Sequence, residues 1–394
     1  MDAPAESTSS PEGRTEVDPM TEEQLAEAKR YSGEELKCNL ADKAIDLLFL
    51  SVVALMLARP LDNWLRESLG LENLWLRLAA MYLVVTCAHF CVSFPLSFYS
   101  GHLLEHKYGL SHQTFRAWLW RYTKGIALTL TLGLLLTEGL YLVIFATHDF
   151  WWLAAAAAFF VVSIVLGQLA PVLIFPLFYK IEPLDDDQIG KRMEKLAGGT
   201  GLSIEGVYRM QMSEETAKAN AMLAGLGTTR RVIMGDTLLD GFTHDEIDVV
   251  FAHEIGHHVH RHLRSMLVMG LVFSMAGFFL CHWIISSWWV SSGWTRELHE
   301  HVYVWPMLML ITTLFLFTLA PIQNAISRHF ERQSDRYALQ RTGNPQAYRS
   351  AFTKLAKLNK DDPDPHPLEV FWLHSHPPIS KRLAMADEVS AVLD

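Results

Sequence analysis

Long apolar stretches limit this chain more than any other feature of its sequence. A helix needs about 20 mostly apolar residues to cross the hydrocarbon core of a bilayer. Six stretches approach or exceed that length, at residues 44–58, 74–98, 125–147, 151–178, 266–290 and 302–319. One such stretch could be a buried core helix, but six in a chain that is 50% hydrophobic and 19% charged indicate a membrane protein. We predict a mainly α fold, a multispan helical bundle of about six spans.

The first forty residues are of a different kind. They are polar and acidic and rich in Ser, Pro and Glu, which predicts a disordered tail over residues 1–40 with a short helix starting near Thr21. They lack the basic start and apolar stretch of a signal peptide. No basic tract with interleaved aromatic residues suggests a nucleic-acid partner. The partners we expect are the lipid bilayer and a protein or peptide.

Lysine and arginine are unevenly distributed among the loops. The first predicted loop holds Arg59 and Arg66, whereas eight basic residues precede the first span or fill the second loop: Lys29, Arg30, Lys37, Lys43, Lys107, Arg116, Arg121 and Lys124. The positive-inside rule therefore places both termini and the segment 179–264 in the cytoplasm. The membrane would be the bacterial inner membrane or the endoplasmic reticulum, depending on the source.

The polar part of the chain is split by the last two predicted spans. We expect a membrane domain of four spans over residues 41–178 and a further domain over 179–394, interrupted by a transmembrane hairpin at about 266–320. In this second domain the sequence predicts short strands at 206–211 and 231–234 and helices at 185–196 and 243–262. Thr243 and Glu246 form a capping box at the start of the last helix. The domain is thus of an α+β type.

The sequence FAHEIGHH, residues 251–258, lies within this last predicted helix. The spacing of His253 and His257 puts both imidazoles on one face, within reach of a single zinc ion. Glu254 then lies beside the open position of the metal, where it can take a proton from water and pass it to a leaving amine. The alternative is a histidine-rich helix at the membrane face, because further histidines follow closely.

A zinc hydrolase needs a third protein ligand. The extended motif HExxHxxGxxH is excluded, because His260 and Leu263 stand where it requires Gly and His. The segment ISRHFERQSDRYA, residues 326–338, supplies carboxylates instead. Glu331 could bind the metal while Asp335, four residues later, orients an imidazole. Solvated helix charges that pair with neighbouring arginines would explain the same pattern.

At this point the sequence resembles a known family, the zinc CAAX prenyl endopeptidases. These are multispan membrane gluzincins with a zincin-like domain, which cut after a prenylated cysteine near the C-terminus of their substrates. The resemblance covers most of the chain from about residue 74 onwards, in family order. It is carried by SFYSGHLLEHKYGLSHQT (97–114), APVLIFPLFYKIEPL (170–184), KANAMLAGL (218–226), RRVIMGDTLL (230–239), AHEIGHH (252–258), SRHFERQSD (327–335), LNKDD (358–362) and HSHPPISKRL (374–383).

The resemblance implies roles for further residues. It makes Glu331 the third ligand of one zinc ion per chain. It implies that Asn220 and the strand 231–234 bind the substrate backbone as an added strand, and that His376 faces the scissile bond, where it could stabilise an oxyanion. Without the resemblance, Asn220 would be a turn residue and His376 a loop residue. Arg382 would pair with a buried acid such as Asp335 or lie on the surface.

We therefore predict a membrane-embedded zinc metalloendopeptidase that hydrolyses peptide bonds near the C-terminus of CAAX-type proteins or peptides by zinc-activated water. Three alternatives are weighed against it. A membrane quality-control metalloprotease without prenyl specificity would have two spans before the motif, not four. An intramembrane site-two protease would carry HExxH inside an apolar span, whereas Asp245 and Asp248 precede it here. An idle scaffold or transporter would not need His253, Glu254, His257 and Glu331 intact.

Overall fold

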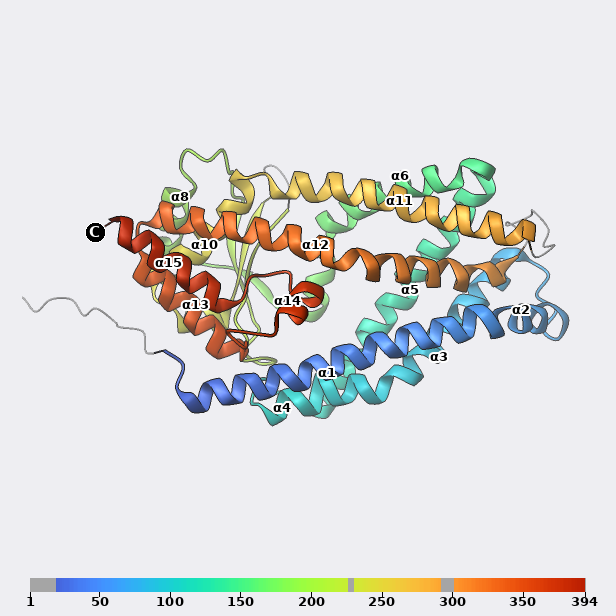
Figure 1. Ribbon diagram of the computed structural model, residues 1–394, viewed down its shortest axis with the longest axis horizontal. Coiled ribbons are helices and arrows are strands. Elements are labelled where there is room, and N and C mark those ends of the chain that lie inside the picture. Colours follow the sequence, from blue (N-terminus) through green and yellow to red (C-terminus); the bar gives the residue numbers. More distant parts are fainter. Residues whose placement is uncertain (1–18, 226–229, 292–300, 394) are drawn as a thin grey trace, which may run out of the picture.

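The computed structural model describes residues 19–225, 230–291 and 301–393. Long helices run along the long axis of the molecule, and a small sheet with shorter helices lies toward one end (Figure 1). The helices before the sheet are α1 (Glu22–Val52), α2 (Ala58–Glu67), α3 (Leu74–Phe98), α4 (Glu105–Lys107), α5 (Phe115–Thr147), α6 (Trp151–Leu169) and α7 (Phe175–Phe178). The later ones are α8 (Asp187–Ala197), α9 (Asp236–Gly241), α10 (His244–Val259), α11 (His262–Ser291), α12 (Trp305–Thr342), α13 (Pro345–Asn359), α14 (Pro367–Leu373) and α15 (Ile379–Leu393).

Five helical segments of the described residues are long and apolar enough to cross a membrane: Glu22–Glu67, Leu74–Lys107, Phe115–Phe178, His262–Ser287 and Val302–Thr342. The third has 64 residues, which is far longer than one crossing needs. It contains α5, α6 and the short α7, and α5 and α6 fold back on each other at His148, where φ is 48°. This segment therefore supplies two crossings. The predicted mainly helical, multispan fold is confirmed.

The N-terminal tail is shorter than predicted. The predicted helix does start near Thr21, but it is not short: all of residues 22–40 belong to α1, and the chain stays helical to Glu67. A capping box between Thr21 and Gln24 starts the helix. Its polar face is held by tertiary contacts that composition does not reveal: the Tyr31 hydroxyl donates to Glu105 at 2.5 Å, and the ammonium of Lys218 donates to the Tyr31 hydroxyl at 2.9 Å. Residues 1–18 lie outside the described ranges.

Four short strands form one mixed sheet. They are β1 (Ile181–Pro183), β2 (Gly206–Met210), β3 (Ala221–Ala224) and β4 (Arg231–Gly235), in the order β1-β2-β4-β3. The strand β2 pairs in parallel with β4, while β1 and β3 pair antiparallel with β2 and β4. The two strands predicted from sequence are β2 and β4. The strands β1 and β3 are too short to show a period-2 pattern, so sequence analysis missed them.

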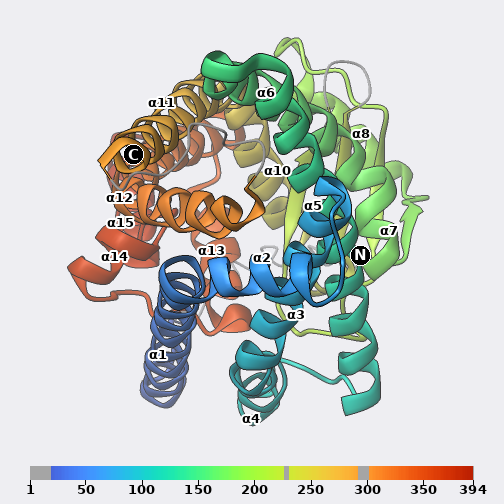
Figure 2. The same cartoon turned by 90° about the vertical axis from the view of Figure 1, so that its right-hand side faces the viewer.

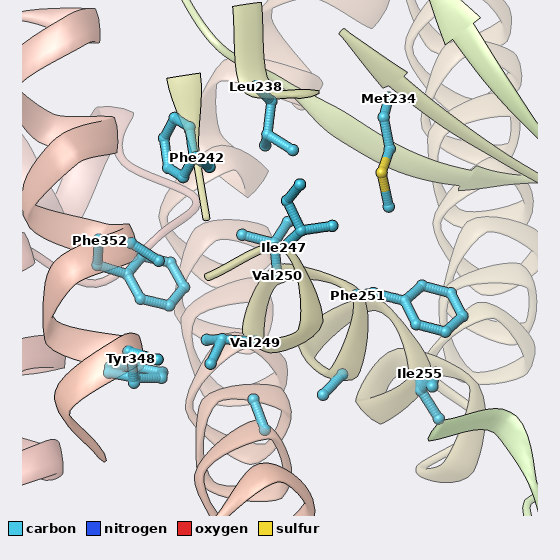
Figure 3. Packing of buried hydrophobic residues seen from close by; sticks show 14 of the residues in the cluster. Met234, Leu238, Phe242, Ile247, Val249, Val250, Phe251, Ile255, Tyr348 and Phe352 are labelled. Carbon is cyan, nitrogen blue, oxygen red and sulfur yellow. The ribbon is translucent and has the colours of Figure 1, made fainter. Parts of the chain in front are cut away.

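A single apolar core joins α10 to the sheet and to helices from the end of the chain. Figure 3 shows Val249, Val250 and Phe251 of α10 among side chains from β4, α9 and α13, including Met234, Leu238 and Phe352. The segments on both sides of the hairpin α11–α12 thus share one core. The helix α12 has 38 residues and continues from the membrane bundle into this core (Figure 1). Its C-terminal half therefore packs against α10.

Candidate metal centre and active site

Contacts at two places fix the helix α10, which carries the motif. At its start the Thr243 hydroxyl accepts a hydrogen bond from the Glu246 N–H, and the Glu246 carboxylate accepts one from the Thr243 N–H at 2.7 Å. Further along, Gly256 lies against α12 so closely that a Cβ there would be 2.8 Å from the Cα of Ser334. Glycine is needed at this position because the two helix backbones meet. The close approach brings Glu331, one turn before Ser334, beside His253 and His257.

Three side chains from α10 and α12 converge on one point. The Nε2 atoms of His253 and His257 lie 3.2 Å apart. Glu331 faces both, with Oε2 at 3.2 Å from His253 Nε2 and Oε1 at 3.3 Å from His257 Nε2. One ligand atom from each residue lies within 4.8 Å of the others. His253 and Glu331 are buried, whereas His257 is partly exposed.

His253 is oriented by a buried ion pair behind it. Its Nδ1 lies 2.9 Å from Asp335 Oδ1, on the turn of α12 after Glu331. The guanidinium of Arg382, from α15, donates to both oxygens of Asp335, at 2.6 and 3.0 Å. It also covers the ring of Phe352 at 3.8 Å. Since Nδ1 of His253 is engaged by a carboxylate, its Nε2 lone pair is directed at Glu331.

His257 has a different partner, and the sequence analysis missed it. Its Nδ1 lies 3.0 Å from Nδ1 of His262, the first residue of α11. The other nitrogen of His262, Nε2, lies 2.9 Å from Oε1 of Gln333. His262 is 2% exposed, and its ring stacks on Phe330 with centroids 4.2 Å apart. His262 therefore holds the outer nitrogen of His257, as Asp335 holds that of His253.

These residues fit a bound metal ion. The buried Oε2 of Glu331 accepts no hydrogen bond, and buried carboxylate oxygens are otherwise almost always paired. Both imidazoles have their Nδ1 atoms engaged and their Nε2 atoms turned toward this carboxylate. Two nitrogens and a carboxylate form a donor set that suits zinc with one position left open.

Glu254 lies next to His253 on the cavity side of α10. Burial raises the pKa of its carboxyl group, although the two histidines act in the opposite direction. The carboxylate accepts a hydrogen bond from the backbone N–H of Leu223 on β3. A carboxyl group with a raised pKa, fixed beside the metal ligands, is suited to accept and return a proton.

A cavity of about 950 Å³ opens in front of this cluster. Its wall includes His253, Glu254 and Glu331, and also Asn220 and His376. Nε2 of His376 lies 3.6 Å from Oε1 of Glu331. Asn220 is exposed to the cavity directly before β3. The structure thus brings His376 and Asn220 to the same cavity as the ligands, with Asp335 and Arg382 behind His253.

The prediction that the strand at residues 231–234 pairs with the substrate backbone is wrong. The sequence analysis gives this role to residues 231–234, but β4 is paired with β2 on one side and with β3 on the other. The two edge strands of the described sheet are β1 and β3, and of these β3 adjoins the cavity, whose wall includes Ala221. The N–H of Gly235 donates to the carbonyl of Asn220 at 2.9 Å. Hydrogen-bonded and non-bonded pairs alternate in an antiparallel ladder, so Ala221 and Leu223 direct their backbone groups to the free edge.

Comparison with known proteins agrees with this fold and this site. The model of peptidase family M48 matches residues 183–390, and the model described as "CAAX prenyl protease N-terminal, five membrane helices" matches residues 6–180. A membrane helical bundle with these matches and a His–His–Glu cluster defines the class of membrane-embedded metalloendopeptidases. The chain belongs to peptidase family M48 and carries the N-terminal region of the CAAX prenyl proteases, which confirms the resemblance noted in the sequence.

Individual relatives support the same family assignment. CAAX prenyl protease 1 of Saccharomyces cerevisiae is 31% identical, and the match covers 76% of this chain and 69% of that protein. The uncharacterized metalloprotease YhfN of Bacillus subtilis is 26% identical over 95% of this chain and 88% of its own. The crystal structure of S. mikatae Ste24p has the same fold, with a TM-score of 0.75 and 23% identity over 95% of this chain and 92% of that one.

Proposed function

We propose that this chain is a zinc endopeptidase that cleaves CAAX-type protein or peptide substrates near their C-terminus at the membrane. The observation that carries the proposal is that the cavity beside the His–His–Glu cluster is bordered by His253, Glu331, Glu254 and the start of the edge strand β3. The names of the yeast relative and of the matching N-terminal model support the substrate class.

His253, His257 and Glu331 would hold the zinc ion. When bound there, zinc would supply a Lewis acid for the attack of water on a peptide carbonyl. Glu254 accepts the proton of the attacking water and delivers it to the leaving amine, since its raised pKa allows both steps. The imidazole of His376, 3.6 Å from Glu331, would donate a hydrogen bond to the carbonyl oxygen as negative charge develops on it.

The substrate would bind as a strand beside β3. Ala221 offers a backbone donor and acceptor on the free edge of β3, and Leu223 offers its carbonyl, since the Leu223 N–H is bonded to Glu254. Asn220 adds an amide side chain at the start of the strand. Leu223 also contacts Glu254, so a peptide paired at this edge would pass the general base.

The proposal includes the orientation of the protein. We place the active site and both termini on the cytoplasmic side, because basic residues gather before the first span and in the loop before α5. A cytoplasmic site would face prenylated proteins on the side of the membrane where prenylation takes place.

Cleavage of two matched peptides tests the proposed function. Purified protein in detergent is incubated with a farnesylated CAAX peptide and with its unprenylated twin, and products are identified by mass spectrometry. We expect zinc-dependent cleavage after the modified cysteine, with a higher kcat/KM for the farnesylated peptide. Equal rates on both peptides would favour a quality-control protease without prenyl specificity. Failure to cleave either peptide by a zinc-loaded sample would favour an idle scaffold.

A further inference from the structure

The short helix α14 (Pro367–Leu373) carries an apolar face that the described residues leave largely exposed. Leu368 is 65% exposed, Phe371 48% and Trp372 37%. Spacings of three and four residues place these side chains on one face of the helix. The helix follows the last candidate membrane span, Val302–Thr342, in a part of the chain where hydropathy gives no sign of a membrane segment.

The opposite face of α14 belongs to the active-site cavity. Glu369 and Leu373, which are four residues apart, contribute to the cavity wall, and His374 follows directly. The loop that starts at His374 carries His376. A single helix thus separates the cavity from the outer surface, with Glu369 and Leu373 on the cavity side and Leu368, Phe371 and Trp372 on the outer side.

Contacts with α12 place α14 at the boundary of the membrane. The ring of Trp372 stacks on Phe317, with centroids 5.2 Å apart, and Phe317 is itself exposed on the apolar part of α12. That apolar part ends near Ile322. Figure 2 shows α14 projecting sideways from the molecule. The exposed face of α14 is therefore continuous with the lipid-facing surface of a spanning helix, at the depth where tryptophan is enriched in membrane proteins.

The C-terminal carbonyl groups of α14 are satisfied by protein donors. Asn324 donates to the Trp372 carbonyl at 2.7 Å, and Arg328 donates to the carbonyls of Val370 and His374 at 2.8 and 2.6 Å. A helix end in water would not need these partners. A helix end beside lipid does, because hydrocarbon offers no hydrogen bonds.

We propose that α14 lies in the interface of the bilayer, with Leu368, Phe371 and Trp372 inserted at the boundary between headgroups and acyl chains. The partner of this surface is the lipid of the bilayer that α12 crosses. The helix then forms the wall between lipid and active-site cavity. The inference does not depend on the substrate of the enzyme.

Depth-dependent quenching tests the proposal in the intact protein. An environment-sensitive fluorophore is attached at Phe371→Cys in a chain whose four native cysteines are replaced, and the protein is reconstituted into phosphatidylcholine nanodiscs with or without doxyl-labelled lipid. Phe317→Cys, on the spanning helix, is the positive control. Glu194→Cys, on an exposed position of α8, is the negative control. Bound zinc is measured for each variant to verify folding.

We expect doxyl lipid to quench the label at residue 371 about as strongly as the label at 317, with a shallow doxyl position most effective. Quenching no stronger than at residue 194 would overturn the proposal. Blue-shifted emission that doxyl lipid does not quench would also overturn it, since a protein partner or second copy would then cover the face. Leu368→Cys repeats the measurement if the first variant does not fold.

Discussion

The Nδ1 atoms of His257 and His262 lie 3.0 Å apart, on two helices that meet at a sharp bend. The bend is at Arg261, where φ is 57°. If His262 donates its Nε2–H to Gln333 Oε1, its Nδ1 accepts the Nδ1–H of His257 and leaves Nε2 of His257 free for a metal. One chain of hydrogen bonds thus selects the tautomer that a zinc ligand requires.

Metal affinity should follow this arrangement. We expect His253→Ala, His257→Ala and Glu331→Ala to lose zinc. His262→Ala should weaken zinc binding by roughly 10- to 100-fold, the usual effect of losing the partner of a ligand. His260→Ala should bind zinc normally, and so should His258→Ala, because neither is in the ligand cluster. Chelator competition on the purified variants gives the affinities. Normal affinity in His262→Ala would show that the contact does not orient the ligand.

Replacement of the general base should separate metal binding from catalysis. Glu254→Gln keeps the shape of the side chain and both imidazoles but cannot accept a proton. We expect full zinc content and a turnover lower by roughly 10²- to 10⁴-fold. Zinc analysis and peptide cleavage on the same preparation provide the two readings. Turnover close to that of the unchanged protein would remove Glu254 from the mechanism.

Asn220 should act on substrate binding. A contact made equally in ground and transition states affects KM more than kcat, and an unpaired buried group costs about 1–3 kcal/mol. Asn220→Ala should therefore bind zinc normally, cleave poorly at low substrate concentration and recover much of its rate at high concentration. If Asn220 is only a turn residue, the variant will have normal kinetics and a lower melting temperature.

The capping residue Glu246 should make stability depend on pH. Burial alone would raise the pKa of its carboxyl group, but hydrogen bonds from Lys354, Ser350 and the Thr243 N–H outweigh burial and lower it. A carboxylate whose pKa is lowered on folding stabilises the fold above its unfolded pKa of about 4.3, and this stabilisation is lost as the pH falls through the folded value.

The free energy of unfolding of Glu246→Gln should thus be lower than that of the unchanged protein at pH 7, by about 1–3 kcal/mol. This gap in stability should narrow below about pH 4. Thermal melts in detergent across this range measure it. Glu194→Gln, which changes an exposed carboxylate on α8, is the matched control. A gap that stays constant with pH would mean that packing, and not the charge of Glu246, stabilises the start of α10.

Membrane topology can be tested with a cysteine-reactive label that does not cross membranes. In a chain without its native cysteines, Glu72→Cys in the loop before α3 should react in intact cells, whereas Glu194→Cys should react only after lysis. The distribution of Lys and Arg is the basis. Residues 292–300, between α11 and α12, lie outside the described residues, so Glu72 reports on that side of the membrane. The reverse labelling pattern would invert the orientation.

Sequence patterns determined those parts of the protein whose cause is local. Crossing a bilayer requires a length of apolar helix that can be counted in the sequence. The spacing of His253 and His257 fixes their common face on any helix, and the capping box at Thr243 fixes where that helix begins. The membrane class, the motif and the start of α10 could therefore be predicted without coordinates.

The remaining features depend on contacts between distant segments. Glu331 reaches the histidines because Gly256 lets α12 approach α10, and His262 reaches His257 because the chain bends at Arg261. The edge strand is β3 and not β4, since strand order is set by pairing across the sheet. Tyr31, on the helix over residues 22–40, bonds to Glu105 and Lys218, which lie far from it in the sequence. Periodicity and composition carry no information on such pairings, so only the packed tertiary structure decides them.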